Sequence, residues 1–236
     1  MSNFWINELE PGYYDKIINQ GLKANKGLRA SWHNYTNLIV KSEVNIHDIH
    51  LDYACGPGTL IGLYTRAEST GVDISEAQII YAINNYGEKG EFFTTENKNF
   101  KTRKTKYNII TVIGLFEFLD DDAIIKLLNK LYKLLLPGGK IVVTTPNFFS
   151  TMYFMVKIQN IIGKNYSELH INKFDKHRLR KLISASQFHN IEIKKYMNAG
   201  VFLGVFNLRF SNRIQKLIEN LFSNFFGYML IAKLTK

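Results

Sequence analysis

Residues 51 to 60 read LDYACGPGTL, and this stretch constrains the fold more than any other part of the chain. An apolar run ends at Asp52, a turn containing Gly56 and Gly58 follows, and a second apolar run begins at Leu60. This pattern predicts a buried strand, a glycine-rich loop and the start of a helix. Glycine lets the backbone turn tightly against a ligand, and a helix start offers unpaired N–H groups. The stretch therefore predicts a pocket for a nucleotide-like ligand.

A second signal follows in the sequence GVDIS, residues 71–75. Asp73 closes a short predicted strand, where a carboxylate can accept hydrogen bonds from both hydroxyls of a ribose. A dinucleotide-binding dehydrogenase also has a glycine-rich turn after a strand, but its GxGxxG turn opens directly after the strand and holds a pyrophosphate. Here the acidic Asp52 precedes the glycines, which suits a ligand that carries an ammonium group and no phosphate.

Together, DYACGPGT and GVDIS resemble the cofactor-binding motif of class I S-adenosylmethionine-dependent methyltransferases. The resemblance implies S-adenosylmethionine as cofactor, with Asp52 and the glycine turn at its methionine part and Asp73 at its ribose. The family also has an acidic residue near the end of the third strand and an apolar residue four positions later. Glu96 and Phe100 have this spacing, with glutamate in place of the usual aspartate, which implies that Glu96 and Asn97 contact the adenine. The implied cofactor-binding residues are Asp52, Ala54, Cys55, Gly56, Gly58, Asp73, Ile74, Glu96, Asn97 and Ile113.

Apolar segments alternate with helical patterns along the rest of the chain. Further strands are predicted at 91–96, from 107 to a turn at Gly114, and at 140–147, with a helix over 121–136. We expect an α/β, Rossmann-like fold with a seven-stranded, mostly parallel sheet and helices on both faces. An N-terminal helical cap and a helix inserted before the last strand complete it. One domain is expected over 1–236, comprising a cap (1–47), a cofactor-binding core (48–147) and an acceptor-side region (148–236).

Apolar spacing also predicts which side of three helices is buried. In the cap, the expected stripe is Leu28, Trp32, Tyr35, Leu38 and Ile39. After Ser75, a good N-cap residue, the expected stripe is Ala77, Ile80, Tyr81 and Ile83. Near the C-terminus, the stripe of Ile214, Leu217, Ile218, Leu221 and Phe222 lies beside Arg213 and Lys216. That helix could pack on the core, form a dimer or lie on an anionic membrane, and packing is the default expectation.

The catalytic candidates are His170 and Glu117. A loop imidazole such as that of His170 can accept a proton from a hydroxyl acceptor at neutral pH. Related small-molecule O-methyltransferases often place a histidine directly after the glutamate, but this chain has Phe118 there. Phenylalanine cannot support a metal ion as histidine can, so no metal is expected. Tyr14, Trp32 and His33 of the cap are the candidate acceptor-binding residues, although each could simply anchor the cap to the core.

Composition narrows the function classes. The formal charge of +10 favours anionic partners such as phosphorylated sugars, acidic lipids or nucleic acid. The alternative interpretation is that the charged side chains only keep the surface solvated. The single cysteine, Cys55, allows no intrachain disulfide, and neither a signal peptide nor a membrane-spanning run is visible. A cytoplasmic protein is expected, with peripheral membrane contact possible. The apolar segment 148–163 could form an acceptor flap, meet lipid or pack against the cap.

The family resemblance implies methyl transfer from S-adenosylmethionine. We expect a small-molecule acceptor, in particular a hydroxyl of a sugar, a lipid-linked intermediate or another metabolite. Nucleic acid is not the expected acceptor, because no recognisable RNA-binding module is present. No NPPY or DPPY turn, which enzymes use to hold the exocyclic amines of bases, follows the strand that starts at residue 107. An RNA or protein methyltransferase and a non-catalytic cofactor-binding partner protein remain the alternatives. The sequence does not specify an oligomeric state.

Overall fold

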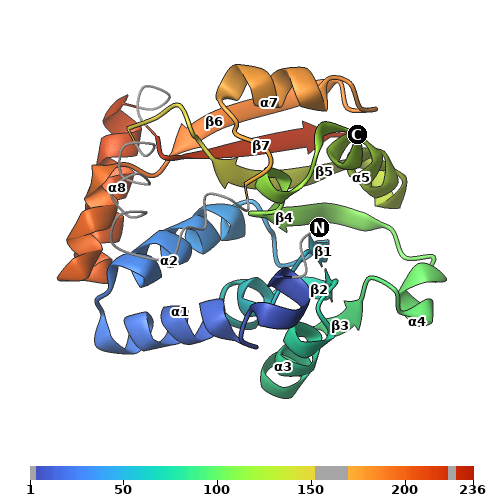
Figure 1. Cartoon of the computed structure of the whole chain (residues 1–236), viewed down its shortest axis with the longest axis horizontal. Coiled ribbons are helices and arrows are strands. Elements are labelled where there is room, and N and C mark those ends of the chain that lie inside the picture. The colour runs from blue at the N-terminus through green and yellow to red at the C-terminus, as the bar shows by residue number, and fades with distance from the viewer. Residues whose placement is uncertain (1–3, 152–169, 223–226) are drawn as a thin grey trace.

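The computed structural model describes residues 4–151, 170–222 and 227–236 (Figure 1). Within these residues, seven strands form one sheet in the order β3-β2-β1-β4-β5-β7-β6. The first five strands pair in parallel, and β7 is antiparallel to β5 and β6. The predicted Rossmann-like, mostly parallel sheet is therefore confirmed. The strands are β1 (Ile49–Tyr53), β2 (Glu68–Asp73), β3 (Glu91–Thr94), β4 (Tyr107–Ile113), β5 (Leu135–Pro146), β6 (Asn190–Tyr196) and β7 (Met229–Thr235).

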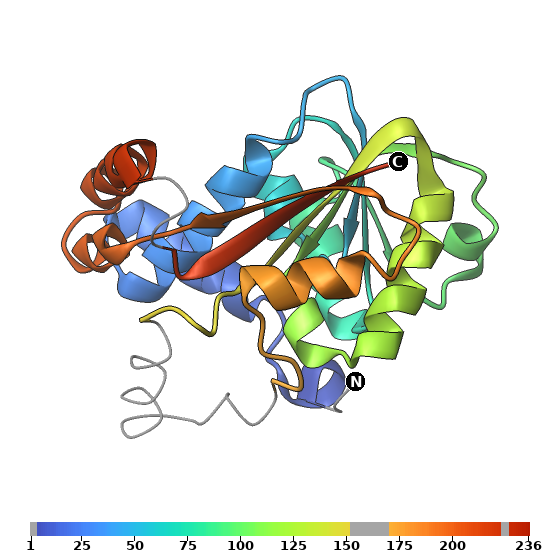
Figure 2. The ribbon, with the colours of Figure 1, turned by 90° about the horizontal axis from the view of Figure 1, so that it is seen from above.

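Helices cover both faces of this sheet, as Figure 2 shows. The longer helices are α1 (Tyr13–Ala24), α2 (Leu28–Lys41), α3 (Glu76–Tyr86), α5 (Asp121–Leu134), α7 (Lys176–Ile183) and α8 (Leu208–Phe222). Shorter helical segments are η1 (Phe4–Glu8), η2 (Leu60–Tyr64), α4 (Lys98–Lys101), η3 (Phe116–Phe118) and η5 (Ala199–Val205). The expected N-terminal helical cap corresponds to η1, α1 and α2. The expected insertion before the last strand corresponds to η5 and α8.

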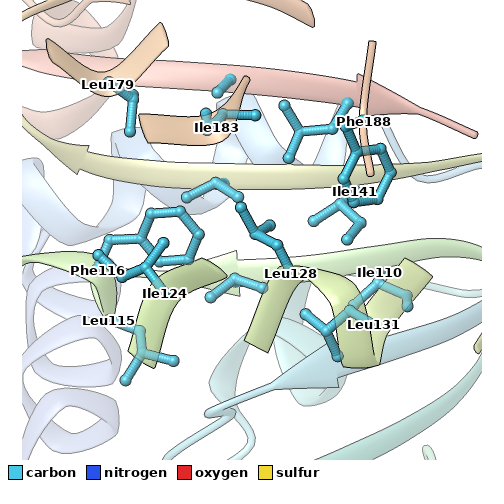
Figure 3. Close-up of a cluster of buried hydrophobic side chains, with 14 of the residues drawn as sticks. Ile110, Leu115, Phe116, Ile124, Leu128, Leu131, Ile141, Leu179, Ile183 and Phe188 are labelled. Carbon is cyan, nitrogen blue, oxygen red and sulfur yellow. The ribbon is translucent and has the colours of Figure 1, made fainter. Parts of the chain in front are cut away.

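Alternate residues of the central strands supply the two halves of the core. On β4, Ile110 packs with Leu128 and Leu131 of α5 on one face, together with Phe188 (Figure 3). The neighbouring Ile109 belongs to a second cluster on the other face with Tyr35 of α2. All six side chains are buried. Successive residues of a strand point to opposite faces, and both faces of this sheet are covered.

The buried side of α3 differs from the apolar stripe expected for it. Ile80 and Ile83 are exposed, and the helix instead buries Gln78, Ile79 and Ala82. The Gln78 side-chain amide donates to the backbone carbonyl of Glu10 at 3.1 Å and accepts the backbone N–H of Gly12 at 3.0 Å. The prediction was wrong because this polar side chain fastens the N-terminal segment to the helix, and the hydrogen bonds turn Gln78 inward.

The cap helix α2 also departs from the prediction in part. Tyr35 is buried as expected, but Leu28 and Leu38 are exposed. The helix instead buries polar residues, among them Asn34 and Asn37. Asn34 accepts a hydrogen bond from the Tyr64 hydroxyl at 2.8 Å, so α2 is held to η2 by polar contacts as well as by packing.

Other local predictions agree with the structure. Ser75 caps α3 as predicted, accepting the backbone N–H of Gln78 at 3.4 Å. Asp120 caps α5 in the same way, by accepting the backbone N–H of Ala123 at 2.8 Å. The apolar residues just before and along α7 are buried, namely Phe174, Leu179, Leu182 and Ile183. The predicted apolar segment 148–163 lies outside the described residues beyond position 151. No helix among the described residues is long and apolar enough to span a bilayer.

Candidate functional site

A cavity of about 430 Å³ lies at the carboxyl ends of the parallel strands, beneath the cap. Asp52 of β1, Asp73 of β2 and Ile113 of β4 all line it. The C-termini of parallel strands share one edge of the sheet, which brings together residues far apart in the sequence. The cap closes the cavity from the other side with η1, α1 and α2, each of which contributes lining residues.

The glycine turn after β1 adopts the backbone predicted for it. Ala54, Gly56 and Gly58 have φ values of 63°, 52° and 77°, in the left-handed region that favours glycine. A Cβ added at Gly56 would meet no atom within 4 Å, because this side of the turn faces the open cavity. A Cβ at Gly58 would lie 2.7 Å from the Phe92 ring. Gly58 is not a lining residue, and it serves instead to pack the turn against β3.

The Asp73 carboxylate braces the turn from the neighbouring strand. One oxygen accepts the backbone N–H of Gly56 at 2.8 Å, and the other accepts that of Ser75 at 2.9 Å. Burial raises the pKa of Asp73, and these N–H donors oppose the increase. Asp73 also lines the cavity, and a carboxylate has more lone pairs than these N–H donors use, so it can accept a ligand hydroxyl as well.

Asp52 is almost completely buried, and burial raises the pKa of its carboxyl to about 7. Its carboxylate accepts a hydrogen bond from the Thr111 hydroxyl at 2.7 Å. The Thr111 oxygen in turn lies 2.8 Å from Nε2 of His50, and Nδ1 of His50 lies 3.0 Å from the Ser69 hydroxyl. Burial lowers the pKa of His50 to about 3, so its imidazole is neutral. A buried hydrogen-bonded chain therefore orients Asp52 from beneath the site.

Glu117 lies on η3, directly after β4, and its carboxyl is buried in the cavity wall. One carboxylate oxygen accepts the Thr145 hydroxyl at 3.1 Å. Burial raises the pKa of Glu117 to about 7, although the hydrogen bonds favour the charged form. The Glu117 backbone carbonyl accepts the N–H of Asn172 at 3.0 Å, which joins η3 to the loop that carries His170.

His170 lines the same cavity, among aromatic rings. Its ring centroid lies 5.1 Å from that of Phe118 and 5.2 Å from that of Phe148. Nδ1 of His170 is buried and has no hydrogen-bond partner within the described ranges. Burial and the nearby Lys173 lower the pKa of His170, so the neutral imidazole is favoured. Trp5 of the cap covers Phe118, with ring centroids 4.6 Å apart.

The three acceptor candidates of the cap also line the cavity. Tyr14 contacts His33 edge to face, with ring centroids 4.9 Å apart. Burial and Arg29 lower the pKa of His33 to about 4, so this imidazole is uncharged at neutral pH. Trp32 stacks on Tyr228 at 6.1 Å, which ties the cap to the end of the sheet that β7 occupies. All three rings thus line the cavity, and the Trp32 contact also anchors the cap.

Glu96 and Asn97 lie outside the cavity lining. The Glu96 side chain is 80% exposed and is paired with Lys101. The Asn97 side chain caps α4 by accepting the N–H of Asn99 at 2.9 Å. Thr95 occupies the lining position in this segment. Ala54, Cys55, Ile74 and Ile113 line the cavity as the motif implies.

Sequence reasoning missed several polar residues of the site. Gln78 and Asn37 line the cavity, and neither belongs to a recognisable motif. Asp15 of the cap helix α1 does not line the cavity itself, but it is buried and accepts hydrogen bonds from Thr59, a lining residue, at 2.9 Å and from Tyr86 at 2.7 Å. A charged residue within an aromatic-rich helix was the available signal, since a buried carboxylate needs donors around it.

The donor set fits S-adenosylmethionine. No salt bridge to Asp52 or Asp73 is found in the described part of the chain, although both carboxyls are buried or nearly so. Buried carboxylates without a cation are costly, and a ligand ammonium would satisfy one of them. The described residues contain no cluster of three or more His, Cys, Asp or Glu side chains arranged to hold a metal ion.

Known proteins resemble the chain in sequence and in fold. A family model described as a methyltransferase domain matches residues 27–193. The tRNA (guanine-N(7)-)-methyltransferase of Clostridium botulinum is 30% identical over 106 residues. That match covers 43% of this chain and 43% of the relative, so the chain spans less than half the length of the curated relatives it matches.

Solved structures share the fold at low sequence identity. The plantazolicin methyltransferase BamL has a TM-score of 0.60 at 17% identity, covering 99% of this chain and 93% of that one. Magnesium protoporphyrin IX methyltransferase from Synechocystis has a TM-score of 0.56 at 14% identity, covering 98% and 90%. A possible histamine N-methyltransferase from Thermotoga maritima has 0.59 at 12%, covering 86% and 89%. Because the family model matches more than half of the chain, this protein belongs to the class I S-adenosylmethionine-dependent methyltransferases.

Proposed function

We propose that the protein transfers the methyl group of S-adenosylmethionine to a hydroxyl of a small-molecule acceptor, with Glu117 as the general base. The observation that carries this proposal is a buried, cavity-lining carboxyl whose pKa is raised to about 7. A general base works best when its pKa lies near the working pH, and a hydroxyl acceptor must lose its proton during methylation. A ring nitrogen with its own lone pair needs no such base.

The cofactor supplies a methyl group that is already activated by a positively charged sulfur. In this proposal, Asp52 holds the ammonium of the methionine part and Asp73 holds the ribose hydroxyls. The open Gly56 allows the backbone to approach the ligand. Thr95 occupies the lining position expected for adenine contacts, and the assignment of the adenine to Glu96 and Asn97 stays a prediction. The protein then mainly aligns the acceptor oxygen with the methyl group and excludes water.

The acceptor would lie between the cap and η3. Trp5, Tyr14 and Trp32 contribute aromatic surface from the cap, and Phe118 contributes it from the core. His170 lies on the same wall, where its neutral imidazole can hold the acceptor hydroxyl by a hydrogen bond. These residues favour an acceptor with a ring or an apolar part beside its hydroxyl, such as a sugar, a lipid-linked intermediate or another metabolite.

RNA is the second candidate acceptor, because the curated relative is a tRNA methyltransferase and the chain carries a formal charge of +10. The buried base favours the small molecule, since N7 of guanine is methylated through its lone pair. The two candidate acceptors can be distinguished by whether a labelled methyl group enters the RNA or the small molecules of a cell extract.

The test uses S-adenosylmethionine carrying a radioactive methyl group, mixed with a cell extract separated into RNA, protein and small-molecule fractions. We expect label in the small-molecule fraction, in a product that resists mild acid as an ether does. Glu117→Gln should reduce turnover about 10²-fold to 10⁴-fold while S-adenosylhomocysteine binding changes little. Thr145→Val is the matched control, because it removes only one hydrogen bond to the carboxylate.

Two results would contradict the proposal. Label confined to material destroyed by ribonuclease would assign the acceptor to RNA. Unchanged turnover by Glu117→Gln, with normal cofactor binding, would remove Glu117 as the base.

A further inference from the structure

Helix α8 packs on the protein through its polar side. Ser211 and Gln215 are both 0% exposed, and the Ser211 hydroxyl lies 3.0 Å from that of Ser31 on α2. One turn further along, the Glu219 carboxylate accepts the Tyr35 hydroxyl at 2.8 Å. Residues spaced by four lie on one side of a helix, so these contacts fix the orientation of α8. The expected packing of this helix through its apolar residues is therefore wrong in part: Ile214 and Ile218 are half-buried, but Leu217, Leu221 and Phe222 are exposed.

The apolar side of α8 is exposed as a consequence. Phe210, Leu217 and Leu221 recur at spacings of seven and four, which places them on one helix face. Leu221 is 67% exposed, and Phe206, just before the helix, is 80% exposed. Figures 1 and 2 show α8 at the outer edge of the molecule, beyond the cap helices. We call Phe206, Phe210, Leu217 and Leu221 the apolar stripe.

Positive charge borders the apolar stripe. Arg209, Arg213 and Lys216 are exposed on α8 and are here called the basic flank. The turn between α1 and α2 lies against η5, because the Gly27 N–H donates to the Gly204 carbonyl at 2.6 Å. Lysine and arginine side chains near this turn add positive charge to the same part of the surface. The segments 16–42 and 198–218 contain no aspartate or glutamate. The charged residues of these two segments are therefore all basic, and Glu219, which follows on α8, is turned toward the Tyr35 hydroxyl and the Met197 N–H.

We propose that the apolar stripe and the basic flank bind an anionic membrane surface, with α8 lying in the plane of the lipid headgroups. Large apolar side chains beside a row of Lys and Arg are typical of helices that lie in the membrane interface. Basic residues near an anionic bilayer each add about 1 kcal/mol, which raises the binding constant about fivefold. A symmetric contact with a second copy would bring like charges together, and RNA binding would leave the apolar stripe uncovered.

Co-sedimentation with vesicles tests this proposal. We expect the full chain to sediment with phosphatidylcholine vesicles that contain phosphatidylglycerol, and much less with phosphatidylcholine alone. Phe206→Ser combined with Phe210→Ser should lower the partition coefficient about tenfold or more, because less apolar area enters the interface. Arg213→Glu combined with Lys216→Glu should lower the partition coefficient by a similar factor. Added salt should weaken the binding of the wild-type chain, so the difference between the wild-type chain and this variant should become smaller.

Matched controls lie on other surfaces. Ile80→Ser removes an exposed apolar side chain from α3, and Lys126→Glu with Lys133→Glu reverses two exposed charges on α5. These variants should sediment like the wild-type chain. Calorimetric binding of S-adenosylhomocysteine shows whether each variant is folded, and it does not depend on which acceptor the enzyme uses.

Three outcomes would overturn the proposal. The first is that anionic vesicles fail to sediment the wild-type chain at low salt. The second is that Phe206→Ser with Phe210→Ser dissociates a dimer seen by light scattering without changing vesicle binding. The third is that the basic flank variant loses affinity for RNA and keeps its affinity for vesicles.

Discussion

The charge state of Asp52 should control both cofactor binding and the stability of the ligand-free protein. Burial moves the pKa of this carboxyl from an ordinary value of 3.8 to about 7. At 1.36 kcal/mol for each pH unit, this corresponds to a preference for the neutral acid on the order of 4 kcal/mol. A ligand ammonium beside Asp52 would reverse that preference, because it favours the carboxylate.

The sign of the pH effect follows from this increase in pKa. Between about pH 4 and about pH 7, folded Asp52 keeps a proton that the unfolded chain has lost. The free energy of unfolding of the ligand-free protein therefore falls as the pH rises through this range. For Asp52 alone, the decrease between about pH 5 and about pH 7.5 is roughly 2.5 kcal/mol. Asp52→Asn should lack this part of the decrease.

Urea unfolding at these two pH values, with and without S-adenosylhomocysteine, measures the effect. Relative to the wild-type chain, Asp52→Asn should gain about 2.5 kcal/mol between about pH 5 and about pH 7.5 without ligand. The ligand should stabilise the wild-type chain more at the higher pH, and should stabilise Asp52→Asn weakly at both. Glu117→Gln is the control for the effect of the ligand. It removes a second buried acid but leaves the proposed ammonium site unchanged. Equal pH dependence in Asp52→Asn and the wild-type chain would refute this reasoning.

Two further predictions concern the cofactor and the cap. Asp73→Ala should weaken S-adenosylhomocysteine binding about 100-fold, since it removes charge-assisted hydrogen bonds, whereas Asp73→Asn should lose less. Unchanged affinity of Asp73→Ala in calorimetry would exclude Asp73 from the ribose site. Asp15→Ala should lower the free energy of unfolding by about 3 kcal/mol in urea, because it leaves the Tyr81, Tyr86 and Thr59 hydroxyls without their acceptor. A loss below about 0.5 kcal/mol would mean that the cap does not depend on this carboxylate.

The strands, the glycine turn and the helix starts were predictable because their causes are local. Gly56 follows a buried strand and has a positive φ, and Ser75 and Asp120 accept N–H groups only three residues ahead. Such features depend on the φ of one residue or on a contact within one turn. The order of parallel strands then brought Asp52 and Asp73 to one edge of the sheet.

The buried sides of α2, α3 and α8 were decided by tertiary contacts. Apolar spacing identifies residues that share a helix face, but it does not specify where that face points. On α3 the Gln78 amide is held by the N-terminal segment, and on α8 Ser211 and Gln215 pack against the protein. In each case, hydrogen bonds to distant backbone or side-chain groups hold polar side chains inward, while some apolar side chains of the same helix stay exposed. The strand pattern and the cofactor motif could thus be read from local residues. The exposed surfaces of α2, α3 and α8 could not, because the polar partners that orient these helices lie far away in the chain.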